Sequence, residues 1–188
     1  MDMVLRRIRR KKKVSEIIKS FHPSPYLVMI SQKIISMQNE NGSWFNNPLL
    51  TALALNALHE ASKTTDLDFE DSLRAGIRYL KRVLKDLSKR ILASDSLYSQ
   101  LDTNSITFSL LINTLETLNH AEIDEDTLLA FQKLESEVTK YCSSLESVEV
   151  VSHMLKCHLI KSIGEPPEEL VKFILNKCLQ LSESEYLL

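Results

Sequence analysis

The chain has 188 residues, 44% hydrophobic and 26% charged, which is an ordinary composition for a globular domain with a buried core. Only three Gly and five Pro are present, so helices are favoured over strands and tight turns. Three Cys, an odd number, without an apolar signal segment exclude a disulfide framework and predict a reducing, cytoplasmic setting. No apolar run approaches the roughly 20 residues that a membrane span needs.

The net charge of −2 hides an asymmetry along the chain. Residues 1–20 have a net charge of +6, and the remaining residues have a net charge of −8. An uneven distribution of charge along a chain gives information about its partners and its solubility, and little about its fold. We therefore predict two parts, a basic N-terminal arm over residues 1–22 and a helical domain over residues 23–188.

The arm concentrates its cations in one short run. These are Arg6, Arg7, Arg9, Arg10, Lys11, Lys12 and Lys13. Three interpretations stay open: a solvated tail, an anionic membrane surface bound through residues 1–20, or nucleic acid or an acidic protein. Val4, Leu5 and Ile8 favour the membrane over nucleic acid, because an interfacial helix needs an apolar edge. A protein of this kind would be cytoplasmic and peripheral at a membrane.

The first helix of the domain is predicted from Pro25 to Met37, with Ser24 as its N-cap. Its apolar positions recur at helical spacing on one face. They are Tyr26, Leu27, Ile30, Ile34 and Met37.

A loop, "NENGSWFNNP", separates this helix from a second one, which begins at Pro48 after Asn47 as N-cap. The second helix is apolar nearly all round, so we expect it to be buried on most sides. Asp68 is the expected cap of the third helix. The inner face of the third helix is predicted to hold Leu73, Ile77, Leu80, Val83, Leu84 and Leu87.

Four further helices follow a polar stretch over residues 92–103. They begin near Ser105, after Asp124, near Glu146 and within the segment 165–181. We expect Gly164 to end the helix that starts near Glu146, as a left-handed residue after Ile163. The helix near Ser105 is apolar on mixed faces, with Ile106, Leu110, Asn113 and Thr117, and is filled out by Phe108, Leu111, Ile112 and Leu115. The inward positions are predicted at Leu128, Phe131, Leu134, Val138 and Tyr141 for the helix after Asp124, and at Leu170, Ile174, Cys178 and Leu181 for the last helix.

Amphipathic helices thus alternate with more deeply apolar ones, and no segment shows the two-residue alternation of a strand. Alternation of this kind is typical of αα-hairpins stacked side by side. The sequence therefore predicts an all-α fold of stacked αα-hairpins.

The stretch "QNENGSW" carries a family resemblance. Gln38, Gly42 and Trp44 occupy the positions of the Q-x-x-x-G-x-W turn, and an Ala-rich helix follows them. Gly42 is predicted to supply a positive φ in this turn, and the Gln38 amide is expected to satisfy helix-end groups. The segment resembles the Gln–Trp repeat of the terpenoid cyclase and protein prenyltransferase superfamily. In that superfamily the turn joins an outer helix to an inner helix of an α/α toroid. The resemblance implies a partial toroid here, of about half the usual length, which would stay open or close by pairing with another copy.

The resemblance also raises the question of an acid or magnesium site. The nearest acidic cluster, Asp66, Asp68 and Asp71, departs from both the Asp-x-Asp-Asp and the Asp-Asp-x-x-Asp patterns. It lies at a predicted helix start, where carboxylates gather for capping, and we favour that interpretation over magnesium binding or proton donation.

A zinc site is the other chemistry that the resemblance suggests. His153 and Cys157 are four residues apart and share a helical face, and Cys142 or Cys178 could complete a set of ligands. Buried structural roles are favoured, because a four-ligand set with metal-type spacing is missing. We expect no cofactor, with zinc and magnesium as the alternatives.

Two functions remain. The first is a non-catalytic binding or assembly module, whose concave face binds a partner or an apolar ligand such as an isoprenoid, alone or as a homodimer. The alternative is an isoprenoid-related enzyme that is active as a dimer or with a partner subunit. An exposed cluster at Asp66, Asp68 and Asp71 would argue against the enzyme. Carboxylates converging in an apolar pocket would favour it. Those to examine are Asp102, Glu116, Glu146 and Glu149.

Overall fold

A computed structural model describes residues 25–97, 100–120, 123–141, 148–160 and 163–185, with only the backbone for 180–185. Within these ranges the protein is all-α, and no strand is present apart from isolated bridges that Trp44 makes with Gln38 and Asn47. The helices are α2 (Pro25–Ser36), α3 (Pro48–Ser62), α4 (Glu70–Ala93), α5 (Leu101–Thr117), α6 (Glu125–Tyr141), α7 (Val148–Cys157) and α8 (Glu168–Glu185).

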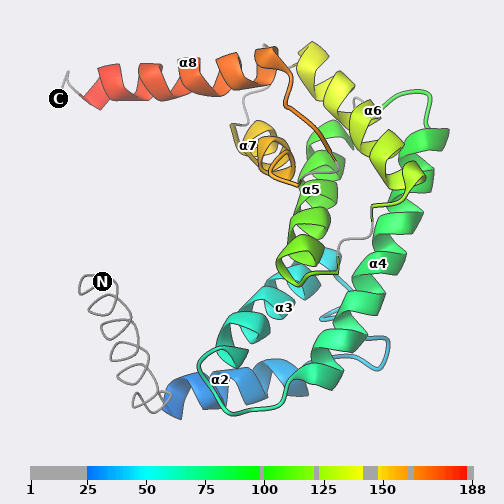
Figure 1. Cartoon of the computed structure of the whole chain (residues 1–188), viewed down its shortest axis with the longest axis vertical. Helices are drawn as coiled ribbons and strands as arrows, with labels where there is room; N and C mark the ends of the chain where they lie inside the picture. Colours follow the sequence, from blue (N-terminus) through cyan, green and yellow to red (C-terminus); the bar gives the residue numbers. More distant parts are fainter. Residues whose placement is uncertain (1–24, 98–99, 121–122, 142–147, 161–162, 186–188) are drawn as a thin grey trace, which may run out of the picture.

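The helices alternate between two layers (Figure 1). Consecutive helices pack as hairpins from α2 to α6 and again at α7 and α8, and in addition α3 packs against α5, α5 against α7, and α4 against α6. The array is curved, with α3, α5 and α7 along its inner side and α4 and α6 along its outer side. The predicted stack of αα-hairpins is therefore present among the described helices.

The core lies between the two layers, and α5 is at its centre. Phe108, Leu111 and Ile112 on α5 are at most 1% exposed, and they belong to the same hydrophobic cluster as fully buried side chains of the neighbouring helices, such as Leu55 and Leu134. Phe108 and Phe131 lie with their ring centroids 6.5 Å apart. Burial of large side chains at 1.5–3 kcal/mol each is the main stabilising term of such a fold, at roughly 25 cal/mol per Å² of apolar surface.

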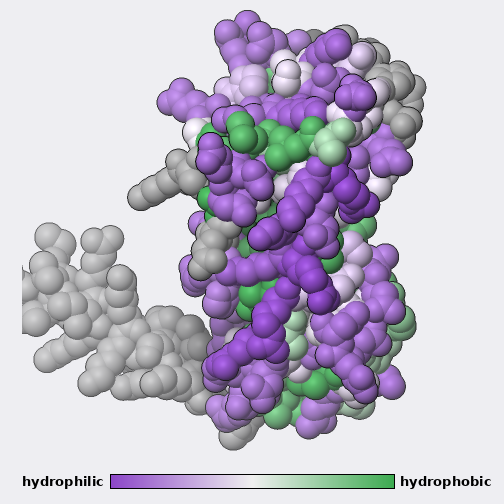
Figure 2. Space-filling view, turned by 90° about the vertical axis from the view of Figure 1, so that its right-hand side faces the viewer, coloured by the Kyte–Doolittle hydropathy of each residue, from purple (hydrophilic) through white to green (hydrophobic). Residues whose placement is uncertain are grey.

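Most predicted inner faces are confirmed. On α4, Ile77, Leu80, Leu84 and Leu87 are buried, and Phe131, Leu134 and Val138 on α6 are buried too. The opposite face of these two helices is mostly hydrophilic (Figure 2). The amphipathic pattern therefore places α4 and α6 correctly at the outside of the array.

Two N-caps were also predicted correctly. The Asn47 side chain accepts hydrogen bonds from the amides of Leu49 and Leu50. The Asp124 carboxylate accepts one from the Thr127 amide, and this bond together with the Thr127 hydroxyl holds the pKa of Asp124 below its usual range. Each carboxylate or amide oxygen satisfies backbone donors that have no partner within the helix.

Three predicted helix boundaries were wrong. Helix α4 begins at Glu70 with Phe69 as N-cap, and the Asp68 carboxylate instead accepts from the Glu70 amide at 2.9 Å. Helix α5 begins at Leu101, four residues before Ser105. Helix α7 ends at Cys157, since the amides of residues 158–160 bond to carbonyls three positions back and tighten the last turn.

The predicted faces of three helices also need correction. Helix α3 was expected to be buried on most sides, but Leu50 and Leu53 on it are 43% and 56% exposed. On α2, Leu27 and Ile34 are partly buried, but Tyr26 and Ile30 are 72% and 51% exposed, and Met37, just after the end of α2, is 39% exposed. The reason is that α2 packs mainly against α3, so one side of it has no neighbour among the described helices. On α8, which packs against α7, Leu170 is buried but Cys178 is exposed.

Candidate functional site

The Gln–Trp turn joins three helices by hydrogen bonds. The Trp44 indole Nε1 donates to the Ile34 carbonyl at the end of α2 at 2.7 Å. The Gln38 amide donates to the carbonyl of Gly42 at 3.0 Å and to that of Ser72 on α4 at 2.9 Å. We predicted that the glutamine would satisfy the helix-end groups, but the tryptophan satisfies the end of α2 and the glutamine ties the turn to α4.

Gly42 is required where it stands. Its φ is +88°, as the predicted turn demands, and an added Cβ would lie 2.3 Å from the Ala75 carbonyl oxygen. Any side chain would therefore push the turn away from α4, besides straining the backbone. Gln38, Gly42 and Trp44 form a structural site, and nothing in their contacts points to chemistry on a substrate.

The acidic cluster is exposed and lies at the start of α4. Asp66, Asp68 and Asp71 are all exposed, and Asp68 accepts the backbone bond described above. Among the described residues no group of three or more His, Cys, Asp or Glu is placed to hold a metal ion. The capping interpretation thus fits what Asp68 does.

Cys157 is a buried thiol. It is fully buried, and its Sγ lies 3.7 Å from the Ser109 carbonyl and 3.5 Å from the His153 carbonyl. Burial raises its pKa to about 11, which disfavours the thiolate that binds zinc. His153 faces Glu149 at 3.9 Å. Of the two other cysteines, Cys178 is exposed on α8, and Cys142 lies outside the described residues.

The carboxylates that would have favoured an enzyme are not gathered in a pocket. Asp102, Glu116 and Glu149 are exposed, and none of them lines a described pocket, while Glu146 lies outside the described residues. The basic arm, residues 1–22 with its seven clustered cations, also lies outside them.

Large apolar side chains are left exposed along the α2–α3 hairpin. We call this set of side chains the hairpin surface. It comprises Tyr26, Met29, Ile30, Met37, Phe45, Leu50 and Leu53, whose exposed fractions range from 39% to 72%. On α2, Tyr26, Met29, Ile30 and Lys33 follow the spacing of a single helical face, and Met37 comes just after the helix ends. Clustered exposed apolar side chains usually mark a surface that contacts a partner or a membrane.

The hairpin is also almost uncharged. Between Pro23 and Leu58 the only charged residues are Lys33 and Glu40. The outer helix that follows is the opposite, since α4 carries seven basic and three acidic residues. The hairpin surface and α4 therefore differ sharply in the partners they suit.

A pocket of about 420 Å³ lies beside α4, and we call it the α4 pocket. Side chains of α3, of α4 and of the segment after α5 line it. They are His59, Glu70, Leu73, Arg74, Ile77, Arg78, Lys81, Leu118 and His120. This site was not predicted from the sequence, although the spacing of Arg74, Arg78 and Lys81 on one helical face was a usable signal.

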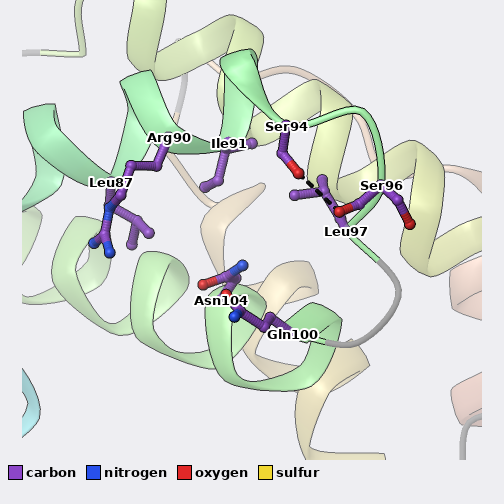
Figure 3. A pocket seen from close by; sticks show the side chains of 8 residues that line it. All are labelled: Leu87, Arg90, Ile91, Ser94, Ser96, Leu97, Gln100 and Asn104. Atoms are coloured by element: carbon purple, nitrogen blue, oxygen red, sulfur yellow. Dashed lines mark hydrogen bonds between the residues drawn. The ribbon is translucent and has the colours of Figure 1, made fainter.

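A smaller pocket of about 170 Å³ lies between the end of α4 and the start of α5 (Figure 3). Arg90 and Leu87 reach into it from α4, Asn104 from α5, and Gln100 from the position just before α5. Its Ser94 hydroxyl is already bonded to the Ser96 carbonyl at 2.7 Å. The space suits a few water molecules or a small ion more than an organic ligand.

An unpredicted polar pair joins α6 to the end of α7. His158 Nε2 lies 2.5 Å from Glu135 Oε1, and its Nδ1 lies 2.9 Å from the Gly164 carbonyl oxygen. The two side chains are 4% and 15% exposed. Because the residues are 23 positions apart in sequence, no local pattern could have indicated the contact.

Comparison with models of known protein families, with curated proteins and with solved structures finds no match. In the described part of the chain, the apolar stretches of the helices are too short to cross a bilayer.

Proposed function

We propose that the protein is a non-catalytic helical binding module that docks on an anionic membrane surface. The hairpin surface and the basic arm are the binding elements. The single observation that carries the proposal is the exposure of seven large apolar side chains on a hairpin that has almost no charge. The proposal includes the partial α/α toroid related to terpenoid cyclases and prenyltransferases, which is supported by the two-layer array and by the contacts of Gln38, Gly42 and Trp44.

Charge favours a membrane over a second copy as the occupant. The arm, with a net charge of +6, directly precedes α2, and the one charged side chain on the exposed face of α2 is Lys33. A symmetric dimer through this face would bring two such arms together, whereas anionic lipid attracts them by about 1 kcal/mol per Lys or Arg. Tyr26 also suits the boundary between headgroups and acyl chains.

No observation on the described residues favours the alternative, an isoprenoid-related enzyme. The Asp66, Asp68 and Asp71 cluster is exposed, and Asp68 is engaged with the start of α4. An active site must be argued from converging groups and not from a fold.

The test is flotation of the full chain with phosphatidylcholine vesicles, with and without phosphatidylserine. We expect binding only with phosphatidylserine and a loss of about tenfold or more for Ile30→Glu, since burying one such side chain contributes 1.5–3 kcal/mol. Leu129→Glu, at a position that is 45% exposed on α6, is the matched control and should bind normally.

Two results would overturn the proposal. One is a wild-type chain that ignores both kinds of vesicle but forms a dimer that Ile30→Glu dissociates, which would assign the hairpin surface to a second copy. The other is equal loss of vesicle binding in Ile30→Glu and Leu129→Glu, which would remove the hairpin surface from the interaction.

A further inference from the structure

The α4 pocket has the size and the lining of a small-molecule site. Its volume of about 420 Å³ falls within the range of about 300–1,000 Å³ typical of ligand pockets. Its base is apolar, because Leu73 is partly buried and Ile77 and Leu118 are 8% and 7% exposed. The pocket is built by three separate parts of the fold, so its shape depends on the packing of α3, α4 and α5.

Cations line one side of this pocket. Arg74, Arg78 and Lys81 are spaced at i, i+4 and i+7 along α4, so they lie on one face of that helix. Glu70 is the only acidic residue in the lining, and its carboxylate is bonded to Arg74. The charged lining is therefore +2 with neutral histidines, and His59 and His120 each add an N–H donor.

This concentration of positive charge is local. The chain outside residues 1–20 is acidic, with a net charge of −8, yet α4 carries seven basic residues. Solvation of an outer helix does not require that excess, and outer helix α6 carries two basic and four acidic residues. The excess on α4 therefore makes this helix complementary to an anion.

We propose that the α4 pocket binds a phosphate monoester with a small apolar body. Such a group carries a charge of about −1.5 to −2 at pH 7 and offers three acceptor oxygens, which matches the +2 lining and its donors. Arginine presents its N–H groups in a planar fork that fits phosphate, and Arg78 makes no ion pair with another described residue. Leu73, Ile77 and Leu118 would contact the apolar body.

The experiment is a titration of the ¹⁵N-labelled full chain with phenyl phosphate, followed by amide chemical shifts. Inorganic phosphate and phenol are the two partial probes. We expect phenyl phosphate to bind more tightly than either and to shift the amides of the pocket. Arg78→Gln should weaken binding by about tenfold or more, as expected for loss of a bond between charged groups.

Two matched variants keep the proposal falsifiable. Lys89→Gln removes a cation of α4 outside both neighbouring pockets, and Arg82→Gln removes one from the pocket on the other side of Arg78. Both should bind phenyl phosphate as the wild type does. Equal losses in all three variants, or shifts spread along the whole of α4, would show a diffuse charge effect and overturn the proposal.

The ester could belong to a soluble metabolite or to a lipid headgroup. Monomeric dihexanoyl phosphatidic acid serves as the lipid probe, and tighter binding than phenyl phosphate would assign the pocket to a headgroup. Equal or weaker binding would assign it to a soluble ester. Ile30→Glu should leave both titrations unchanged, so the pocket and the membrane proposal can fail separately.

Discussion

The α2–α3 turn and the α7–α8 junction attach neighbouring parts of the array in different ways. At the first, Trp44 and Gln38 donate neutral hydrogen bonds to backbone carbonyls, and Gly42 lets the turn approach Ala75. At the second, the buried Cys157 thiol and the contact between His158 and Glu135 hold the helices together. The difference teaches that the first attachment depends on shape and neutral hydrogen bonds, whereas the second buries groups that can ionise.

The largest expected effect is at Gly42. Gly42→Ala should destabilise the fold by at least about 3 kcal/mol, because the Cβ meets the Ala75 carbonyl at 2.3 Å in a strained backbone conformation. Gly164→Ala is the matched control, since its φ of +91° is similar but nothing lies within 4 Å of the added carbon. We expect it to cost about 1 kcal/mol. Urea unfolding measures both, and equal losses would contradict the role of close approach.

The next effect is an alkaline loss of stability at the α7–α8 junction. Burial raises the pKa of Cys157 from its ordinary 9.0 to about 11, so the folded state holds the proton more tightly than the unfolded state. The resulting stability is complete below pH 9 and is lost as the pH rises to about 11, at up to about 2.5 kcal/mol. Unfolding of the wild type and of Cys157→Ala across this range checks the prediction. Parallel pH profiles for the two proteins would refute it.

Removal of the Glu135 carboxylate should come third. Glu135→Ala leaves the buried His158 ring without its 2.5 Å partner, and we expect a loss of about 2 kcal/mol. Glu149→Ala removes a similar contact to His153, but that carboxylate is 69% exposed and 3.9 Å away, so the loss should stay below about 0.5 kcal/mol. Thermal unfolding of both variants distinguishes a buried pair from a surface pair.

The smallest effect is expected at Trp44. Trp44→Phe keeps most of the buried ring but removes the bond to the Ile34 carbonyl, which also accepts from the Met37 amide. A loss of about 1 kcal/mol, independent of pH between 6 and 9, should appear in unfolding followed by circular dichroism. Phe45→Ala, at a residue that is 61% exposed, is the control. A larger loss of stability in Phe45→Ala than in Trp44→Phe would contradict the role given to the Trp44 hydrogen bond.

The same contrast explains what could be predicted from the sequence. Local patterns gave the all-α class, the caps at Asn47 and Asp124 and the conformation of Gly42, because each depends on residues a few positions apart. The contact of Glu135 with His158 and the α4 pocket could not be predicted, because they join residues distant in sequence. The exposed face of α2 was missed for a related reason, since apolar spacing identifies a face but not whether anything covers it.

The contact of Gly42 with Ala75 also determines where this chain can tolerate changes in length. One extra residue in α4 between Ala75 and Leu80 would rotate everything beyond it by about 100°, so the turn and the core could not both keep their places. Extra residues between Ser94 and Leu97, outside any helix, would leave both in register. Insertions and deletions that preserve the fold should therefore be excluded from the first half of α4 and concentrated in the connection to α5.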